Sequence, residues 1–553
     1  MEQSPAMSNG RYDVIIIGAG AGGGTMAFEL APTGKHVLLI ERGDYLKREP
    51  DNWDPTAVFV DGKYQAKETW FGSDGESFHP GLHYFVGGNT KVYGGALFRL
   101  RAEDFGDLPL VDGFSPAWPV GYDVFEPYYT RAEQLFHVHG LRGADPTEPP
   151  ASAPYPFAPV RHEPRIQQLV DGLEQAGHHP FPQPLAILLD EVDGRVAPHS
   201  ACVRCDAFDG FPCLTNGKAD AQIMCVDPAV AYDNVTLLTG TYVQRLITDS
   251  AGRSVTGVEV IRGGERETYE ADVVVVSAGA LSSALLMFRS ASDAHPNGLA
   301  NGSDQVGRNY MRHNNSAFMT VSREPNDTVF QKTFALNDFY FGADDWQYPM
   351  GCIQSLGKSH GAQVRAEGLP EMIAGFFPKM PFDEIARHSI DFWLMSEDLP
   401  LLSNRITLGK DGRVTLVVNP TGGEAHARLR DNLKGLLGAI DAHPHLLPRS
   451  LYLGKNIPIG GTAHQAGTVR FGTDPATSVL DRDCKAHELD NLYVVDGGFF
   501  PSIGAVNPTL TIIANALRVA DHLIARLGGP NRASTTQSNP ASAIPAPATA
   551  TQG

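Results

Sequence analysis

The clearest hydrophobic pattern lies at the start of the chain. Residues 14–17 form an uninterrupted apolar run, a glycine-rich stretch and a helical stretch follow, and residues 37–40 form a second apolar run. Short continuous apolar runs are typical of strands buried on both faces, as in parallel sheets. The pattern therefore predicts a strand–turn–helix–strand unit over residues 11–45.

Three further apolar stretches, at residues 235–243, 255–261 and 271–276, predict strands. The last one runs through a turn of small residues, 277–280, into an apolar helix over 281–288, which repeats the geometry of the opening unit. Residues 315–455 alternate apolar and polar positions over many short stretches, which predicts a mainly antiparallel sheet with a few helices. A long amphipathic helix is predicted from about residue 510 to 527.

Together these elements predict an α/β fold with a discontinuous Rossmann-like dinucleotide-binding domain and a second domain built on a mainly antiparallel β-sheet flanked by helices. We expect the first domain to comprise residues 11–110, 196–312 and 456–527. The remaining ranges are cap elements at 111–195, a substrate-binding domain at 313–455, and a tail at 528–553 whose composition predicts disorder.

The glycine stretch of the opening unit has a spacing that suits a dinucleotide. Gly18 permits a tight turn, Gly20 permits close approach of a pyrophosphate, and Gly23 permits the helix to pack on the strand. The helix N-terminus then faces the phosphates with its partial positive charge. Glu41, 23 residues after Gly18, is placed to bind an adenosine ribose. The sequence therefore predicts a dinucleotide site.

Composition and charge narrow the class of protein. The chain has 553 residues and a net charge of -19, which argues against nucleic acid or an anionic membrane as a partner. It contains neither a run of about 18 apolar residues nor a basic region followed by an apolar stretch near residue 1. We therefore expect a cytoplasmic enzyme, without a membrane span, that acts on small molecules.

Two late segments carry residues suited to chemistry. His464 and Arg470 lie in a glycine- and threonine-rich stretch at 460–472, and Asp496 and Asn507 lie in a second stretch at 496–509. Together with the opening glycine motif and a second glycine cluster at 86–95, these segments resemble the glucose–methanol–choline (GMC) family of FAD-dependent alcohol oxidoreductases. The resemblance spans residues 11–527, and the sequence around His464 and Asn507 is most similar to the pyranose-oxidase-like branch.

The resemblance implies a mechanism that physical chemistry also favours. His464, as a neutral imidazole, takes the hydroxyl proton of an alcohol while a hydride leaves the adjacent carbon for the flavin. Asn507 hydrogen-bonds the same oxygen and stabilises its developing negative charge. A purely structural histidine and a simple helix-capping asparagine are the alternatives for these two residues.

The resemblance also implies which residues hold the cofactor. FAD is expected to be bound without a covalent bond, because Val92 occupies the position at which some pyranose oxidases carry a histidine joined to the flavin. The expected FAD contacts, besides the four residues of the opening motif, are Arg42, Gly87, Gly88, Asn89, Thr90, Val92, Tyr93, Gly94, Val243, Ala278, Gly279, Asp496, Gly497, Pro508 and Thr509.

Four of the six cysteines are close together in the sequence: Cys202, Cys205, Cys213 and Cys225. Soft thiolates at such spacing can hold Zn²⁺ or an iron–sulfur cluster. Their gaps match no familiar zinc-finger or ferredoxin spacing, so no metal is expected, and buried or partly free thiols are favoured over a cluster or a disulfide.

The predicted function is FAD-dependent oxidation of an alcohol group on a sugar or glycoside. The electron acceptor is O₂ or an organic or protein partner. The alternatives are a dehydrogenase subunit with a cysteine-bound cluster, a nicotinamide-dependent reductase, and a flavoprotein without catalysis. Candidate substrate contacts in the antiparallel sheet are Gln331, Asn337, Asp338, Tyr340 and Trp393.

Overall fold

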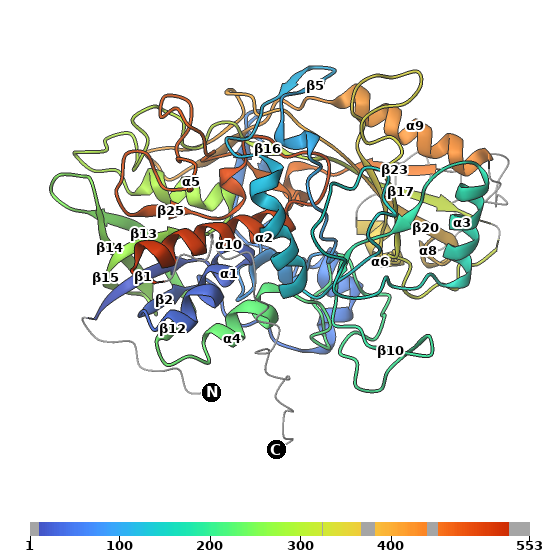
Figure 1. Cartoon of the computed structure of the whole chain (residues 1–553), viewed down its shortest axis with the longest axis horizontal. Coiled ribbons are helices and arrows are strands. Elements are labelled where there is room, and N and C mark those ends of the chain that lie inside the picture. The colour runs from blue at the N-terminus through green and yellow to red at the C-terminus, as the bar shows by residue number, and fades with distance from the viewer. Residues whose placement is uncertain (1–9, 323, 367–381, 440–451, 530–553) are drawn as a thin grey trace.

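The computed structural model describes residues 10–322, 324–366, 382–439 and 452–529. Two sheet regions lie side by side (Figure 1). The first contains strands from the beginning, the middle and the end of the described chain, and the second contains mainly strands that follow residue 313. The predicted tail at 528–553 lies almost wholly outside the described residues.

The first sheet forms because its central strands are apolar on both faces. β1 (Arg11–Ile17) pairs in parallel with β2 (Val37–Ile40) and with β15 (Glu265–Val276), and all four residues of β2 are buried. The seven strands run in the order β12-β2-β1-β15-β14-β13, with β25 beside the end of β15. The other four strands are β12 (Val235–Leu238), β13 (Thr241–Thr248), β14 (Val255–Arg262) and β25 (Leu492–Val494).

Helices from both ends of the chain cover this sheet. α1 (Ala21–Leu30) packs against α10 (Thr509–Arg526), which in turn packs against α2 (Tyr122–Leu135). α5 (Ala280–Arg289) packs against β13 and lies on the other side of the sheet in Figure 1. The first and last segments of the chain therefore share one hydrophobic core.

The second large sheet is antiparallel and has six strands in the order β23-β17-β20-β19-β18-β8. One face packs on α3 (Pro164–Gln175) and α9 (Gly423–Ala439) through a separate hydrophobic cluster. The strands are β8 (Phe181–Pro182), β17 (Asn314–Val321), β18 (Phe334–Leu336), β19 (Cys352–Ser355), β20 (Ser389–Ser396) and β23 (Tyr452–Asn456).

A smaller four-stranded sheet joins distant parts of the chain. β21 (Arg405–Leu408) and β22 (Val414–Val417) pair with β3 (Trp70–Gly72) and β4 (Ser77–Phe78). Three further short helices are α4 (Asp227–Ala229), α6 (Gly361–Ala366) and α8 (Phe382–His388).

The predicted fold class is confirmed, and two details of the prediction are wrong. The strand expected over 235–243 is two strands, because Gly240, at φ +58°, turns the chain between β12 and β13. Residues 405–408 do not join the large antiparallel sheet but pair across to β22. α10 begins at Thr509, with Pro508 as its N-cap, close to the start predicted at about residue 510. Across the described ranges, no helix is both long and apolar enough to span a bilayer.

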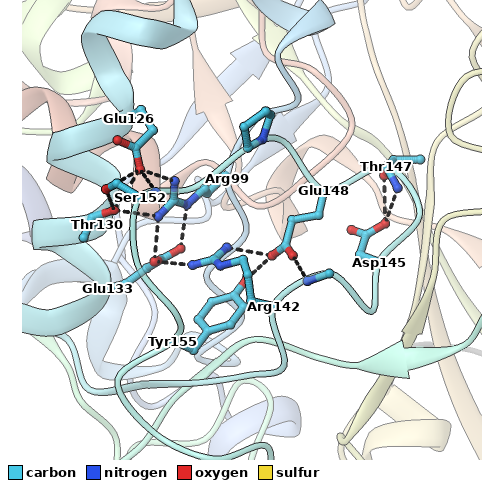
Figure 2. Close-up of polar contacts among 12 residues, drawn as sticks. Arg99, Glu126, Thr130, Glu133, Arg142, Asp145, Thr147, Glu148, Ser152 and Tyr155 are labelled. Atoms are coloured by element: carbon cyan, nitrogen blue, oxygen red, sulfur yellow. Dashed lines mark hydrogen bonds and ion pairs between the residues drawn. The ribbon is translucent and has the colours of Figure 1, made fainter.

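A buried ionic network fastens α2 to the segment that follows it. Arg99 donates to Glu133 through Nε at 2.7 Å and Nη2 at 2.8 Å, and both side chains are 1% exposed. Arg142 also donates to Glu133, at 2.7 Å, and pairs with Glu148, as Figure 2 shows. Tyr155 donates to the same Glu148 carboxylate. Glu133 therefore bridges the two arginines, and Glu126 and Glu148 supply the remaining negative charge.

We expect Glu133→Ala to destabilise the fold by about 2–4 kcal/mol, because it removes the bidentate partner of the buried Arg99 and leaves the Arg99 Nε–H without an acceptor, while Glu126 and Glu148 still offset part of the charge. Urea unfolding followed by circular dichroism measures this. Glu424→Ala, which removes a largely exposed pair with Arg428 on α9, is the matched control and should change stability by less than about 1 kcal/mol. Equal midpoints for the two variants would contradict the assignment of Glu133 as the central counter-charge.

Candidate active site

A cavity of about 750 Å³ lies between the two large sheets. Its walls come from the carboxyl ends of β1, β2 and β15, from the second glycine cluster, and from β17, β19 and β20 of the antiparallel sheet. Ligand sites in open α/β sheets lie beyond the carboxyl ends of parallel strands. This volume falls in the upper part of the roughly 300–1,000 Å³ range usual for ligand pockets.

The turn between β1 and α1 has room only for glycine at two positions. Gly18 has φ +99°, and a Cβ there would lie 2.3 Å from the Ser277 carbonyl oxygen. A Cβ at Gly23 would lie 1.9 Å from the Gly18 carbonyl oxygen. The first contact lets the end of β15 approach the turn, and the second lets α1 pack on it.

The same turn builds an anion-binding cradle. α1 begins after Gly20 with no side-chain cap and no acidic residue in its first turn, so its first N–H groups face the cavity. Gly20 and Gly88 face each other, and a Cβ on Gly88 would lie 3.1 Å from the Gly20 Cα. The two glycine segments therefore lie in contact, and the cavity that both of them line can accept an extended anionic group such as a pyrophosphate beside them.

Glu41 closes one end of this cradle. Its Oε2 accepts from the Ala19 N–H and its Oε1 from the Gly43 N–H, each at 2.9 Å. Burial raises the pKa of this carboxyl, while those two backbone donors oppose the shift. Arg42 beside it pairs with Glu68 and stacks 4.1 Å above the Tyr84 ring. These residues offer acceptors and a flat cation for a ribose and a base.

Asp496 joins the late segment to the turn after β15. Its Oδ2 accepts from the Gly279 N–H at 3.0 Å and from the Ser283 hydroxyl, and its Oδ1 accepts from the Gly498 N–H at 2.8 Å. Burial raises the pKa of the Asp496 carboxyl, and the hydrogen bonds oppose that shift. The carboxylate thereby holds Gly279 and Gly497 together at the cavity wall.

His464 lies on the cavity wall with a second histidine behind it. The Nδ1 atoms of His464 and His313 are 2.9 Å apart, and His313 Nε2 lies 3.0 Å from the Gly504 carbonyl oxygen. Burial, and secondarily the charge of Lys332, lowers the pKa of His464 to about 4. His464 is therefore a neutral imidazole near neutral pH, one edge of which opens to the cavity.

Asn507 lines the same cavity, just before α10. Its Oδ1 accepts from Gln354 Nε2 at 2.7 Å, which fixes the orientation of the amide. The N-cap of α10 is Pro508, so helix capping does not account for Asn507. The fixed orientation leaves the amide N–H₂ as the end that can donate to a ligand.

The structure brings most of the predicted site residues to this one cavity. Gly23 and Gly87 are absent from the described lining, because they serve the packing of their turns. The predicted residues that line it are His464, Asn507, Gly18, Gly20, Glu41, Arg42, Gly88, Asn89, Thr90, Val92, Tyr93, Gly94, Val243, Ala278, Gly279, Asp496, Gly497, Pro508 and Thr509.

The predicted substrate contacts need correction. Trp393 lines the cavity, whereas Gln331, Asn337 and Tyr340 are at most 1% exposed and hydrogen-bond to carboxylates inside the protein. Asp338 instead bonds to His179 outside the cavity. Polar side chains in this region were expected to face a ligand, but buried carboxylates require them as donors.

The side chains that do face the cavity form a row across three strands. The register pairs Ala317 with Trp393 and Trp393 with Gln354, and the row ends at Asn507 through the Gln354 hydrogen bond. Lys332, which is 3% exposed and pairs with Asp209 at 2.6 Å, adds a buried cation to the same wall. Sequence reasoning missed Gln354 and Lys332; strand alternation starting from Trp393 signals the face, but not the cross-strand register.

The cysteines form no metal site. All six are free thiols, and among the described residues no group of three or more histidine, cysteine, aspartate or glutamate side chains is arranged to hold a metal ion. Cys225 lies within 3.7 Å of the Thr25 hydroxyl, where it packs under α1. Burial raises the pKa of Cys202 to about 12 and that of Cys205 to about 11, so both are unreactive thiols.

Comparisons with known proteins agree with this geometry. Two models described as GMC oxidoreductase match residues 12–315 and 455–516. Paromamine 6'-oxidase of Streptomyces fradiae is 32% identical over 93% of this chain and 92% of its own. 6'''-Hydroxyparomomycin C oxidase of Streptomyces lividus is 31% identical over 94% and 93%. The crystal structure of pyridoxine 4-oxidase from Mesorbium loti, at 19% identity, has a TM-score of 0.61 and covers 93% of this chain and 99% of that one.

We expect Gly20→Ala to fold normally but to bind the dinucleotide at least ten-fold more weakly. Its new Cβ meets only Gly88 Cα, at 3.9 Å, within the protein, yet it stands where the pyrophosphate must approach. Titration of the cofactor-free protein, followed by intrinsic fluorescence, measures the affinity. Gly435→Ala, on α9 with no atom within 4 Å of its added Cβ, is the control and should bind normally. Unchanged affinity in Gly20→Ala would contradict the cradle.

Proposed function

This chain belongs to the GMC oxidoreductase family, and from that premise we propose that it oxidises a hydroxyl group of a sugar or glycoside. FAD is the cofactor of the family and of this chain. The observation that carries the proposal is that His464 and Asn507 both line the cavity that also contains the dinucleotide cradle.

His464 is suited to the role of general base. Its pKa of about 4 keeps the imidazole neutral across physiological pH, so a ring nitrogen is free to accept a proton. Bound FAD supplies the acceptor for the hydride that leaves the alcohol carbon. As that C–H bond breaks with its electron pair, the hydroxyl proton moves to His464 and the carbon–oxygen bond becomes a carbonyl.

Asn507 is suited to hold the oxygen that loses its proton. The hydrogen bond from Gln354 occupies the amide oxygen, so the amide nitrogen is directed to donate to the substrate oxygen. A fixed donor aimed at developing negative charge stabilises the transition state more than the ground state. His464 and Asn507 together would orient the alcohol for reaction.

The cavity contains residues suited to each part of FAD. The N–H groups after Gly20 would bind the pyrophosphate, and Glu41 would bind the ribose. Thr509 begins α10 at the cavity, so the positive end of that helix would favour negative charge on the flavin. Arg42 and Val243 would border the adenine end.

The substrate proposal rests on two observations. The row of Trp393 and Gln354 presents an aromatic ring and an amide, which suit the apolar face and the hydroxyl groups of a sugar ring. Two relatives at 31–32% identity bear the names of aminoglycoside oxidases.

The electron acceptor is O₂ or an organic or protein partner. The six free thiols favour the reducing conditions of the cytoplasm.

A substrate screen tests the proposal directly. Under anaerobic conditions, we expect at least one monosaccharide, glycoside or aminoglycoside to bleach the flavin, while simple short alcohols react more slowly. Hydrogen peroxide formed on admitting air identifies an oxidase, and turnover only with a dye identifies a dehydrogenase. A flavin that no alcohol reduces would show a flavoprotein without this catalysis.

We expect FAD to be released completely by acid precipitation. Val92 lines the cavity at the position expected for a flavin-linked histidine, and a valine side chain has no nucleophile with which to form the bond. Absorbance of the supernatant, compared with that of the native protein, gives the released fraction. A yellow pellet, or a fluorescent band for the chain on a denaturing gel, would show a covalent link.

We expect His464→Gln to lower kcat by about 10²–10⁴-fold, because it removes the base, while the FAD content stays unchanged. Asn507→Ala should lower kcat by about 10²-fold, since it removes one donor to the developing charge.

In the unsubstituted enzyme, kcat/KM should stay level from pH 8 to about pH 5. It should then fall as the pH approaches the His464 pKa of about 4 and the imidazole becomes protonated.

A flavin spectrum that matches the unsubstituted enzyme is the control for both variants. An acid limb of kcat/KM centred near pH 6.5, the ordinary range of histidine, would contradict the buried, neutral state of His464. Full activity of His464→Gln would rule this residue out as the base.

A further inference from the structure

His313 lies directly behind His464 and contacts it through a single nitrogen pair. The two rings are nearly perpendicular, at 87°, with their centroids 5.0 Å apart, so the 2.9 Å contact joins the two Nδ1 atoms edge to face. His313 is 1% exposed. The contact is therefore a hydrogen bond between the enclosed imidazole of His313 and the imidazole of His464 on the cavity wall.

The backbone decides which nitrogen of His313 carries a proton. His313 Nε2 lies 3.0 Å from the Gly504 carbonyl oxygen, and a carbonyl can only accept. His313 must therefore be protonated at Nε2. A second proton at Nδ1 would make it a cation, which burial and the neighbouring His464 both oppose, as the lowered pKa of His313 reflects. Nδ1 of His313 is then an acceptor.

The hydrogen bond between the rings now has only one direction. Because His313 Nδ1 accepts, His464 Nδ1 must donate to it. A neutral imidazole has a single N–H, so the Nε2 of His464 carries the lone pair. We propose that His313 is a positioning residue that fixes His464 in its Nδ1–H tautomer, so that Nε2 is the nitrogen that accepts the substrate proton. Its catalytic meaning rests on the function proposed above.

His313 orients the base without relaying the proton. The chain of hydrogen bonds ends at the Gly504 carbonyl, which cannot be protonated under working conditions. When His464 gains its second proton, its Nδ1–H still donates to His313, and that bond becomes charge-assisted and stronger. His313 therefore stabilises the imidazolium while the proton stays on His464.

The accepting carbonyl is itself held in place. The Gly504 N–H donates to Glu397 Oε1 at 3.2 Å, and the Ala505 N–H donates to the Tyr340 hydroxyl at 3.0 Å. Ser115 donates to the same Glu397 oxygen at 2.6 Å. Asn507 follows two residues after this turn, so one rigid segment sets both the tautomer of His464 and the position of the second catalytic side chain.

The tautomer can be read in the resting holoenzyme without any substrate. ¹⁵N spectra of histidine-labelled protein at pH 7.5, with His464 identified by the signals lost in His464→Gln, should show a protonated Nδ1 and an unprotonated Nε2. In His313→Phe, Nδ1–H loses its buried acceptor, so the His464 proton should move to Nε2. A resting enzyme protonated at Nε2 would overturn the proposal outright.

Kinetics of matched variants give the second test. We expect His313→Phe to lower kcat by at least about 10²-fold with KM within about three-fold, since a base in the wrong tautomer loses its chemistry rather than its binding. His313→Gln, whose amide offers one acceptor and one donor, should recover at least ten-fold of that loss. The control is His426→Phe, because His426 is a buried histidine between the hydroxyls of Ser316 and Ser396. It should retain kcat within about three-fold.

The outcomes separate this inference from the proposed function. If no alcohol reduces the flavin of the unsubstituted enzyme, the proposed function fails, while the ¹⁵N spectra still decide the tautomer. If the enzyme turns over and His313→Phe keeps kcat within about three-fold, the positioning role fails and His464 remains the base. If His313→Phe does not fold, the spectra of the unsubstituted protein and the kinetics of His313→Gln decide.

Discussion

The carboxylate of Asp496 is the interaction on which the architecture of the site depends. It accepts hydrogen bonds from the turn after β15, from Ser283 at the start of α5, and from the Gly498 N–H of its own segment. A buried carboxylate with three donors is strongly directional, because each lost bond would leave a desolvated charge. It thereby ties the last part of the chain, which contains Asn507, to the turn after β15, and the Ser277 carbonyl of that turn lies against Gly18 of the cofactor cradle.

The cavity also depends on the absence of side chains. Gly18 and Gly23 allow backbone to meet backbone at distances that a Cβ would forbid, so β15 and α1 close around the end of β1. The parallel strands provide a cradle for an anion, and the antiparallel sheet provides a wall of polar and aromatic side chains. The first sheet thus supplies backbone groups at the ends of its parallel strands, and the antiparallel sheet supplies side chains from one face. The site forms where the two sheets meet.

Electrostatics at the site follow from burial. The protein holds a neutral imidazole at His464 and a cation at Lys332 on one wall, although the chain as a whole is strongly acidic. A neutral base requires a low pKa, and enclosure by protein supplies it. The carbonyl of Gly504 then sets the proton on His313, and through it the proton on His464. The position of one backbone carbonyl thus determines, through the ring of His313, which nitrogen of His464 can accept a proton.

The sequence by itself determined the parts that depend on local spacing: the strand–glycine–helix unit, the dinucleotide site, and the pairing of His464 with Asn507 through resemblance to a family. Motif spacing is readable because a turn or a helix start constrains neighbours in the chain. The side chains that the antiparallel sheet directs into the cavity could not be predicted from the sequence. Gln331, Asn337 and Tyr340 serve buried carboxylates, while Gln354 and Lys332 face the cavity. Only the tertiary structure decided this, because strand register and the satisfaction of buried charges are set by residues that are far apart in the chain, such as Gln331 and Asp391 or Asn337 and Asp145.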